Sequence, residues 1–188
     1  MKVGETVSLK EMKARWAFSE IRSPRLSADY HLDPRVPPLS ARMGTAAYEF
    51  LSEEDTEALV GIFETFRGNY LQHYWADVRV FVVEVWSADR LGQVYVMSEA
   101  DPTGAGRFQL FSAYAVAPRS TGPAARLDPR VAADSVPLSM ALRTSDPLVV
   151  GQYKDFRVLI DGYFRGLIFM RSAAPTERVA VLVPVTGA

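Results

Sequence analysis

The sequence predicts an α+β protein in which helices accompany a mixed β-sheet. Three observations support this class: a long amphipathic helix over residues 53–74, a series of short strands over residues 78–116, and a strand–helix–strand pattern near the C-terminus. The chain has 188 residues, of which 48% are hydrophobic, and is therefore long enough to bury a full core. These features fit two small lobes or a single compact domain.

The N-terminal segment is predicted to contain a short strand, a helix and a loop. Residues 6–9 have strand character, and residues 10–21 form a mixed segment with helical spacing of its large side chains. Residues 23–38 contain four prolines, which exclude a long helix there. We expect this last segment to be a loop that lies over another element.

The most regular helical signal follows, at residues 53–74. Ser52 is a favourable N-cap, Asp55 stands three residues later as in a capping box, and neighbouring glutamates complement the helix dipole. One face carries apolar side chains at spacings of three and four, so we expect this face to pack onto a sheet. The apolar residues are Leu59, Ile62, Phe63, Phe66, Tyr70 and Tyr74.

Residues 78–116 are predicted to form an antiparallel meander of three strands. Valine and aromatic residues dominate residues 78–86 and 93–97, and the polar segment between them is interpreted as a turn. A third strand, residues 107–116, follows a glycine-containing loop. This loop lacks the lysine and the following helix of a phosphate-binding loop, so we interpret it as a hairpin connection.

A segment rich in proline and alanine, residues 118–134, is the candidate linker of the chain. It would divide an N-terminal lobe, residues 1–117, from a C-terminal lobe, residues 135–188. The alternative is that both lobes form one domain.

The candidate functional site lies where an apolar strand ends at Asp161 and Gly162. We expect Asp161 to cap a helix that begins after Gly162, and Arg165 to lie on its first turn. Backbone N–H groups and a cation can together hold an anion such as phosphate, while Gly162 lets a ligand approach the backbone and Tyr163 could stack on it. The alternative is a β-hairpin, because Asp-Gly between apolar runs is a common two-residue turn.

The order of elements around this motif resembles the ParB/sulfiredoxin-like superfamily. A strand with a leading proline, a polar turn, a strand that ends in Asp-Gly-x-x-Arg, a helix and a last strand follow one another over residues 128–185. Asp161, Gly162 and Arg165 match the usual motif of that superfamily. Phe164 stands where the superfamily most often has histidine, which removes a proton-transfer group but leaves anion binding through Arg165.

The resemblance implies a stand-alone domain that contacts nucleotide phosphates or nucleic acid. Arg130 is the candidate for an arginine that precedes the small helix of such domains. The chain has no cysteine, so the thiol chemistry of sulfiredoxins is excluded.

From these observations we expect binding of a nucleotide or another phosphate-bearing ligand, with a nucleoside triphosphate and magnesium as the candidate cofactor. The sequence leaves catalysis open. One alternative is a metal-dependent nuclease or phosphotransferase that uses carboxylates such as Asp155 and Asp161. Another is a non-catalytic module with a protein partner, as in phage, defence or mobile-element systems.

Charge and composition limit these functions further. The net charge of −1 disfavours wholesale wrapping of nucleic acid, which requires a field of cations. The two histidines, His31 and His73, have no partner at metal-ligand spacing, so no metal site is expected. No run approaches the roughly 20 apolar residues that span a bilayer. We therefore expect a cytoplasmic protein without a membrane segment.

Overall fold

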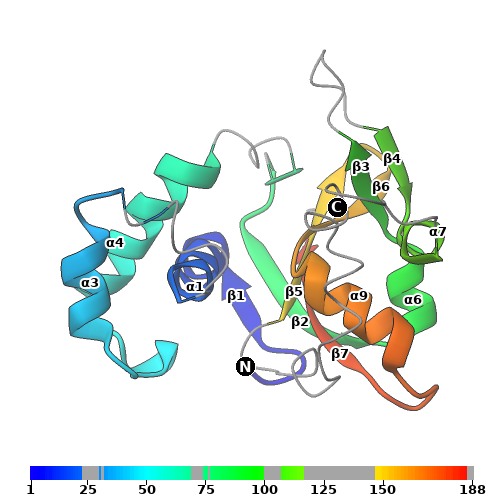
Figure 1. The fold of residues 1–188 in the computed structure, drawn as a ribbon, viewed down its shortest axis with the longest axis horizontal. Helices are drawn as coiled ribbons and strands as arrows, with labels where there is room; N and C mark the ends of the chain where they lie inside the picture. The colour runs from blue at the N-terminus through cyan, green and yellow to red at the C-terminus, as the bar shows by residue number, and fades with distance from the viewer. Residues whose placement is uncertain are drawn as a thin grey trace, which may run out of the picture. The chain divides into compact units, whose positions relative to one another are not determined.

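The computed structural model describes residues 1–22, 30, 32–68, 74–75, 77–99, 107–116 and 147–185. These residues form helices and a seven-stranded mixed sheet (Figure 1). The strand order across the sheet is β1 (Thr6–Ser8), β2 (Val80–Trp86), β7 (Val179–Val185), β5 (Leu148–Tyr153), β6 (Phe156–Asp161), β3 (Tyr95–Glu99) and β4 (Arg107–Leu110). The predicted α+β class is confirmed.

The chain divides into two compact units. Val7–Phe81 belongs to the first, here called the helical unit, and Met1–Thr6 with Val82–Val185 belongs to the second, the sheet unit. The predicted linker, residues 118–134, lies outside the described residues.

Two helices of the helical unit, α1 and α4, begin at a serine that caps them. The hydroxyl of Ser8 accepts a hydrogen bond from the Glu11 amide, and that of Ser52 accepts one from the Asp55 amide, both at 3.1 Å. The predicted cap at Ser52 is therefore confirmed. β1 (Thr6–Ser8) begins at the last N-terminal residue of the sheet unit, and the helices that follow it are α1 (Leu9–Ile21), α3 (Val36–Met43), η1 (Tyr48–Phe50), α4 (Glu53–Phe63) and η2 (Glu64–Gly68).

The helix predicted over residues 53–74 changes geometry partway along. After α4 ends at Phe63, the chain continues as the π-helical segment η2 to Gly68. Phe63 is buried as predicted, whereas Phe66 is only half-buried, with its ring 4.6 Å from that of Tyr30. The buried face of α4 packs against the helix α1 and not, as the sequence predicts, onto a sheet.

The core of the helical unit is aromatic. The rings of Trp16 and Phe63 meet edge to face at 5.4 Å, and the Trp75 ring lies 5.9 Å from Phe63. All three side chains are buried. Tyr70, another residue of the predicted apolar face, lies outside the described residues.

The predicted meander is wrong in its first hairpin. Ser87 caps a short helix, α6 (Ala88–Gly92), between β2 (Val80–Trp86) and β3 (Tyr95–Glu99), so the chain leaves β2 without turning back beside it. In the sheet, β3 pairs antiparallel with β4 (Arg107–Leu110) and parallel with β6. The rest of the predicted third strand forms the helix α7 (Phe111–Val116).

The C-terminal order of elements agrees with the sequence. β5 (Leu148–Tyr153) and β6 (Phe156–Asp161) form an antiparallel hairpin, α9 (Tyr163–Ser172) follows, and β7 (Val179–Val185) lies parallel to β5. The predicted strand–turn–strand–helix–strand pattern is confirmed, and the alternative of a hairpin at Asp161-Gly162 is wrong.

Helices α6, α7 and α9 pack against one another and cover a buried cluster on one face of the sheet unit (Figure 1). The fully buried side chains at its centre include Trp86, Phe111, Leu167 and Phe169. Among the described residues, no helix has the length and apolar character needed to cross a membrane.

Candidate functional site

The predicted site residues meet at the C-terminal end of β6. Asp161 is the last residue of β6, and Gly162, with φ 80° and ψ 20°, is the N-cap of α9. No side chain caps this helix, so the prediction that Asp161 caps it is wrong. The helix starts one residue later because Gly162 takes the left-handed conformation and its carbonyl accepts a hydrogen bond from the Gly166 amide at 2.8 Å.

Packing explains the glycine at position 162. A Cβ atom there would lie only 3.2 Å from Leu148 Cα and would overlap the end of the Leu148 side chain. Gly162 therefore lets the turn lie against the start of β5, a structural reason that needs no ligand.

Arg165 joins the ends of two neighbouring strands. Its Nη2 atom donates a hydrogen bond to the Pro147 carbonyl at 3.3 Å and lies 3.9 Å from Asp161 Oδ2. The side chain is 15% exposed. The Arg165 guanidinium thus contacts the protein's own groups at the ends of β5 and β6. These contacts are those of a cation that holds the two strand ends together.

The other predicted residues also make internal contacts or fall outside the described part of the chain. The Tyr163 ring lies 5.6 Å from that of Phe111 and 5.1 Å from that of Tyr114. Arg130 belongs to the residues that the structure does not describe. The structure therefore brings Asp161, Gly162, Tyr163 and Arg165 together, as a turn packed on the core.

The two aspartates named in the alternative of a metal-dependent nuclease or phosphotransferase are far apart. Asp155 precedes the first residue of β6 and Asp161 is its last residue, so their Cα atoms are separated by about 20 Å at the usual strand rise. One ion cannot bind both carboxylates. Within the described residues, no cluster of three potential metal ligands occurs.

A pocket lies at the opposite end of β6. Its volume is about 390 Å³, which falls in the size range of small-molecule sites. Its walls combine aromatic rings, two arginines and two glutamines around one aspartate. The lining residues are Trp86, Arg90, Gln93, Val94, Tyr95, Gln152, Asp155, Phe156 and Arg157.

Strand pairing positions these side chains. β3 and β6 run parallel with Tyr95 opposite Val158, so the two strands begin at the same end of the sheet. β5 and β6 are joined there by the two-residue turn Lys154-Asp155, with Tyr153 opposite Phe156.

The preceding helix α6 and the end of β2 complete the pocket. Arg90 lies on α6, and its guanidinium carbon is 4.5 Å from the centre of the Trp86 ring. Glu84 accepts a hydrogen bond from Trp86 Nε1 at 2.7 Å and lies 2.5 Å from Arg90 Nη2. Glu84 therefore fixes both the indole and Arg90 and balances the Arg90 charge.

Arg157 differs from Arg90 in its polar contacts. Its guanidinium carbon lies 5.9 Å from the centre of the Trp86 ring, within the range of a cation–π contact. No hydrogen bond or ion pair connects its side chain to another residue in the described ranges. Arg157 thus presents a cation with unused donors on an aromatic wall.

Sequence reasoning missed this pocket. The sequence indicates a turn where α6 forms, and it indicates only a strand at Arg157. The available local signal was the run Tyr153-Lys154-Asp155-Phe156-Arg157, in which cations alternate with aromatic residues at a hairpin turn.

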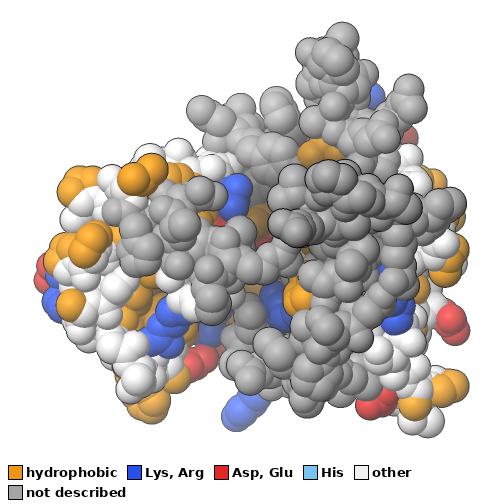
Figure 2. All heavy atoms as spheres, in the orientation of Figure 1, with side chains coloured by type: hydrophobic (Ala, Val, Ile, Leu, Met, Phe, Trp, Pro, Cys, Tyr) orange, Lys and Arg blue, Asp and Glu red, His pale blue; other side chains and the backbone are white. Residues whose placement is uncertain are grey.

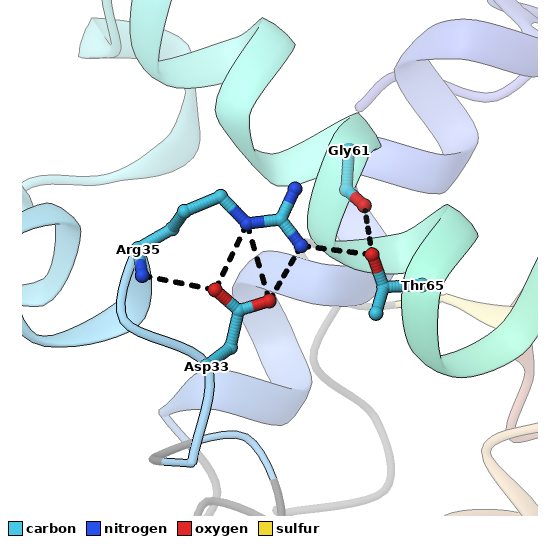
Figure 3. A network of polar contacts seen from close by, with 4 residues as sticks. All are labelled: Asp33, Arg35, Gly61 and Thr65. Carbon is cyan, nitrogen blue, oxygen red and sulfur yellow. Dashed lines mark hydrogen bonds and ion pairs between the residues drawn. The ribbon is translucent and has the colours of Figure 1, made fainter.

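The helical unit contains a polar network of a different kind (Figure 3). Arg35 donates from Nε to Asp33 Oδ1 at 2.9 Å and from Nη2 to Thr65 Oγ1 at 2.8 Å, and the Thr65 hydroxyl donates to the Gly61 carbonyl at 2.9 Å. The hydrogen bonds from Arg35 hold the pKa of Asp33 below its ordinary value. These contacts join the loop before α3 to α4 and η2, so we assign the network a structural role.

Comparisons of the chain with protein-family models, curated proteins and solved structures gave no match. The resemblance to the ParB/sulfiredoxin-like superfamily stays a prediction.

Proposed function

We propose that the sheet unit binds a nucleotide, or a similar ligand that joins a planar ring to a phosphate, in the pocket between α6 and the β5–β6 turn. The observation that carries this proposal is the position of Arg157, which lines a cavity of about 390 Å³ beside Trp86 and makes no polar contact with another described residue.

The charges of the pocket support an anionic group near Arg157. The positive charge of Arg90 is neutralised by its ion pair with Glu84, so Arg90 adds little to the electrostatic potential of the pocket. Arg157 has no such counterion among the described residues. A guanidinium with unused donors binds phosphate oxygens in a forked arrangement, and binding is stronger where the surroundings are apolar.

The remaining walls suit a planar, polar ring. Tyr95 and Phe156 lie 4.7 Å apart and offer apolar surface, while Gln93 and Gln152 supply amide groups. The Asp155 carboxylate can accept hydrogen bonds from ring N–H or amino groups, although it would repel a phosphate placed beside it. A base near Asp155 with its phosphate near Arg157 satisfies both requirements.

The turn at Asp161 and Arg165 is the other candidate location for a phosphate. Its arginine already contacts Pro147 and Asp161, so a phosphate there would have to displace these contacts. The pocket requires no such displacement, and we therefore place the ligand at Arg157. The proposal concerns binding and assigns no catalytic step.

Isothermal titration calorimetry with each of the common nucleoside triphosphates, with and without magnesium and at low ionic strength, tests this proposal. We expect Arg157→Ala to weaken binding by about 1.5–3 kcal/mol, the range for hydrogen bonds to charged groups. Arg157→Lys should restore only part of the affinity, because an ammonium group cannot make the forked contact.

The matched control is Arg178→Ala. Arg178 carries the same charge in the same unit but donates to the backbone carbonyls of Pro175 and Glu177. This variant should bind as the wild type does. Equal affinity of the wild type and Arg157→Ala, or absence of binding by any of these nucleotides, would contradict the proposal.

A further inference from the structure

We infer that the pocket is one end of a longer surface that binds single-stranded nucleic acid, and that this surface continues over four aromatic side chains of β3–β6. The inference rests on the proposed function, because the pocket would hold one nucleotide of the strand. The four residues, here called the aromatic face, are Tyr95, Phe108, Tyr153 and Phe156.

Strand register places the four side chains on one face of the sheet. Tyr153 lies opposite Phe156, Tyr95 opposite Val158, and Phe108 opposite Met97. Directly opposed residues share a face, and residues two apart on a strand share it as well. The rings accordingly meet: Phe108 lies 5.1 Å from Tyr153 and 5.2 Å from Phe156.

This face is opposite the one that α9 covers. Val96, Val150 and Leu159 alternate with the aromatic positions along β3, β5 and β6 and belong to the buried cluster that packs with α9. The four rings are each only half-buried. Aromatic side chains that are not needed to fill the helix-covered core are therefore grouped with part of their surface exposed to solvent.

A cation lies at the edge of the aromatic face. Lys154 Nζ is 5.5 Å from the centre of the Tyr153 ring, and no polar contact joins the Lys154 side chain to another described residue. Lys154 also has a φ of 50°, a conformation that favours glycine, and the Gln152 amide supports the turn by donating to the Lys154 carbonyl at 2.7 Å. A lysine is thus held where a glycine would fit with less strain.

The aromatic face and the pocket are continuous. Tyr95 and Phe156 line the pocket and belong to the aromatic face. Lys154 lies in the β5–β6 turn, and Arg157 is the second residue of β6 after it. A chain of nucleotides that starts in the pocket would therefore reach the Phe108 and Tyr153 rings next.

Single-stranded nucleic acid fits this chemistry better than a duplex or an apolar partner. Unpaired bases expose faces that stack on aromatic side chains, and their phosphates pair with cations. A duplex hides those faces, and an apolar partner would bury Lys154 and Arg157 without counterions. Figure 2 shows Lys and Arg side chains of the described residues at several places on one face of the molecule. The inference uses two cations, Lys154 and Arg157, so binding would use few phosphates.

Fluorescence anisotropy with labelled oligothymidylates of about two, four and eight nucleotides tests the inference, because stacking adds affinity with each base bound. We expect the dissociation constant to fall about tenfold or more between a mononucleotide and about four nucleotides, and then to level off. With two phosphates contacted, the logarithm of the binding constant should fall with the logarithm of salt concentration with a slope of about −1.4.

Two variants separate the aromatic face from the pocket. Tyr153→Leu removes a ring that does not line the pocket, so it should weaken binding of the longer oligonucleotides by about fivefold or more and leave mononucleotide affinity unchanged. Tyr48→Leu is the control, since Tyr48 is a half-buried ring that stacks with the cation Arg15 in the helical unit.

The variant Lys154→Gly separates a loss of binding from a loss of folding. Glycine suits the backbone at this position, so the melting temperature should be maintained or raised while oligonucleotide affinity falls severalfold.

The outcomes distinguish this inference from the proposed function. Mononucleotides and oligonucleotides that bind equally tightly would overturn the inference and leave the pocket proposal intact. Equal binding of a duplex would also overturn it. The same holds if Tyr153→Leu leaves oligonucleotide affinity unchanged but converts a dimer to a monomer in analytical ultracentrifugation, which would assign the aromatic face to protein contact. If nothing binds, both ideas fail.

Discussion

The two ends of β6 carry similar residues and have different roles. At the C-terminal end, Arg165 is 15% exposed and donates to the Pro147 carbonyl, with Asp161 nearby. At the N-terminal end, Arg157 is exposed beside Trp86 and has no polar contact with the described residues. Each arginine stands within four residues of an aspartate in the sequence. The sequence around each arginine therefore does not decide its role. An arginine that contacts the protein's own groups stabilises the fold, and one without such contacts is available to a ligand.

The helical unit supports this distinction. Asp33 and Arg35 are neighbours in sequence, and their hydrogen bonds to each other and to Thr65 use most of their polar atoms (Figure 3). Such a pair stabilises the fold and offers little to a ligand.

The largest expected effect tests whether the Asp161 end is structural. Gly162→Ala should destabilise the protein by about 2–6 kcal/mol, because it adds backbone strain and overlap with Leu148. Urea denaturation measures this change.

Gly4→Ala is the matched control for Gly162→Ala. Gly4 has a φ of 82°, close to the 80° of Gly162, but a Cβ atom there would meet nothing within 4 Å. It should cost only about 1–2 kcal/mol, the strain of the backbone alone. Equal losses for the two variants would mean that the turn is not packed against β5 as described.

A smaller effect is expected for a paired charge in the helical unit. Asp33→Asn should lower stability near pH 7 by about 1–2 kcal/mol, because it weakens a hydrogen-bonded ion pair whose arginine is partly exposed. The folded pKa of Asp33 lies below its ordinary value of 3.8, so the unfolded chain takes up the proton first as the pH falls.

The stabilisation from Asp33 is therefore present above about pH 4 and is lost as the pH falls through the folded pKa. The difference between the wild type and Asp33→Asn should shrink over that range in chemical denaturation. A difference that stays constant with pH would show that the charge of Asp33 does not contribute.

The sequence predicted the elements whose signals are local. The apolar runs and the Asp161-Gly162 pair located β5, β6, α9 and β7, and Ser52 located the start of α4. The predicted N-cap of α9, Asp161, is one residue before the observed N-cap, Gly162. An Asp-Gly dipeptide is compatible both with an aspartate cap and with a left-handed glycine at the start of a helix.

The errors arose where structure depends on distant pairing. The hairpin between β2 and β3 was wrong because Ser87 caps a local helix and β3 finds its partner in β6, much later in the chain. For the same reason the pocket was missed: Trp86 and Arg157 come together only through the sheet and α6.

The most direct test of the central claim compares Arg157→Ala with Arg165→Ala in nucleotide titration and in thermal melting. We predict that Arg157→Ala weakens binding at least about tenfold and changes stability by less than about 0.5 kcal/mol. Arg165→Ala should do the reverse, with a loss of about 1–3 kcal/mol of stability and unchanged affinity in the folded protein. Weaker binding in Arg165→Ala together with unchanged binding in Arg157→Ala would contradict this account and place the ligand at the Asp161 end of β6.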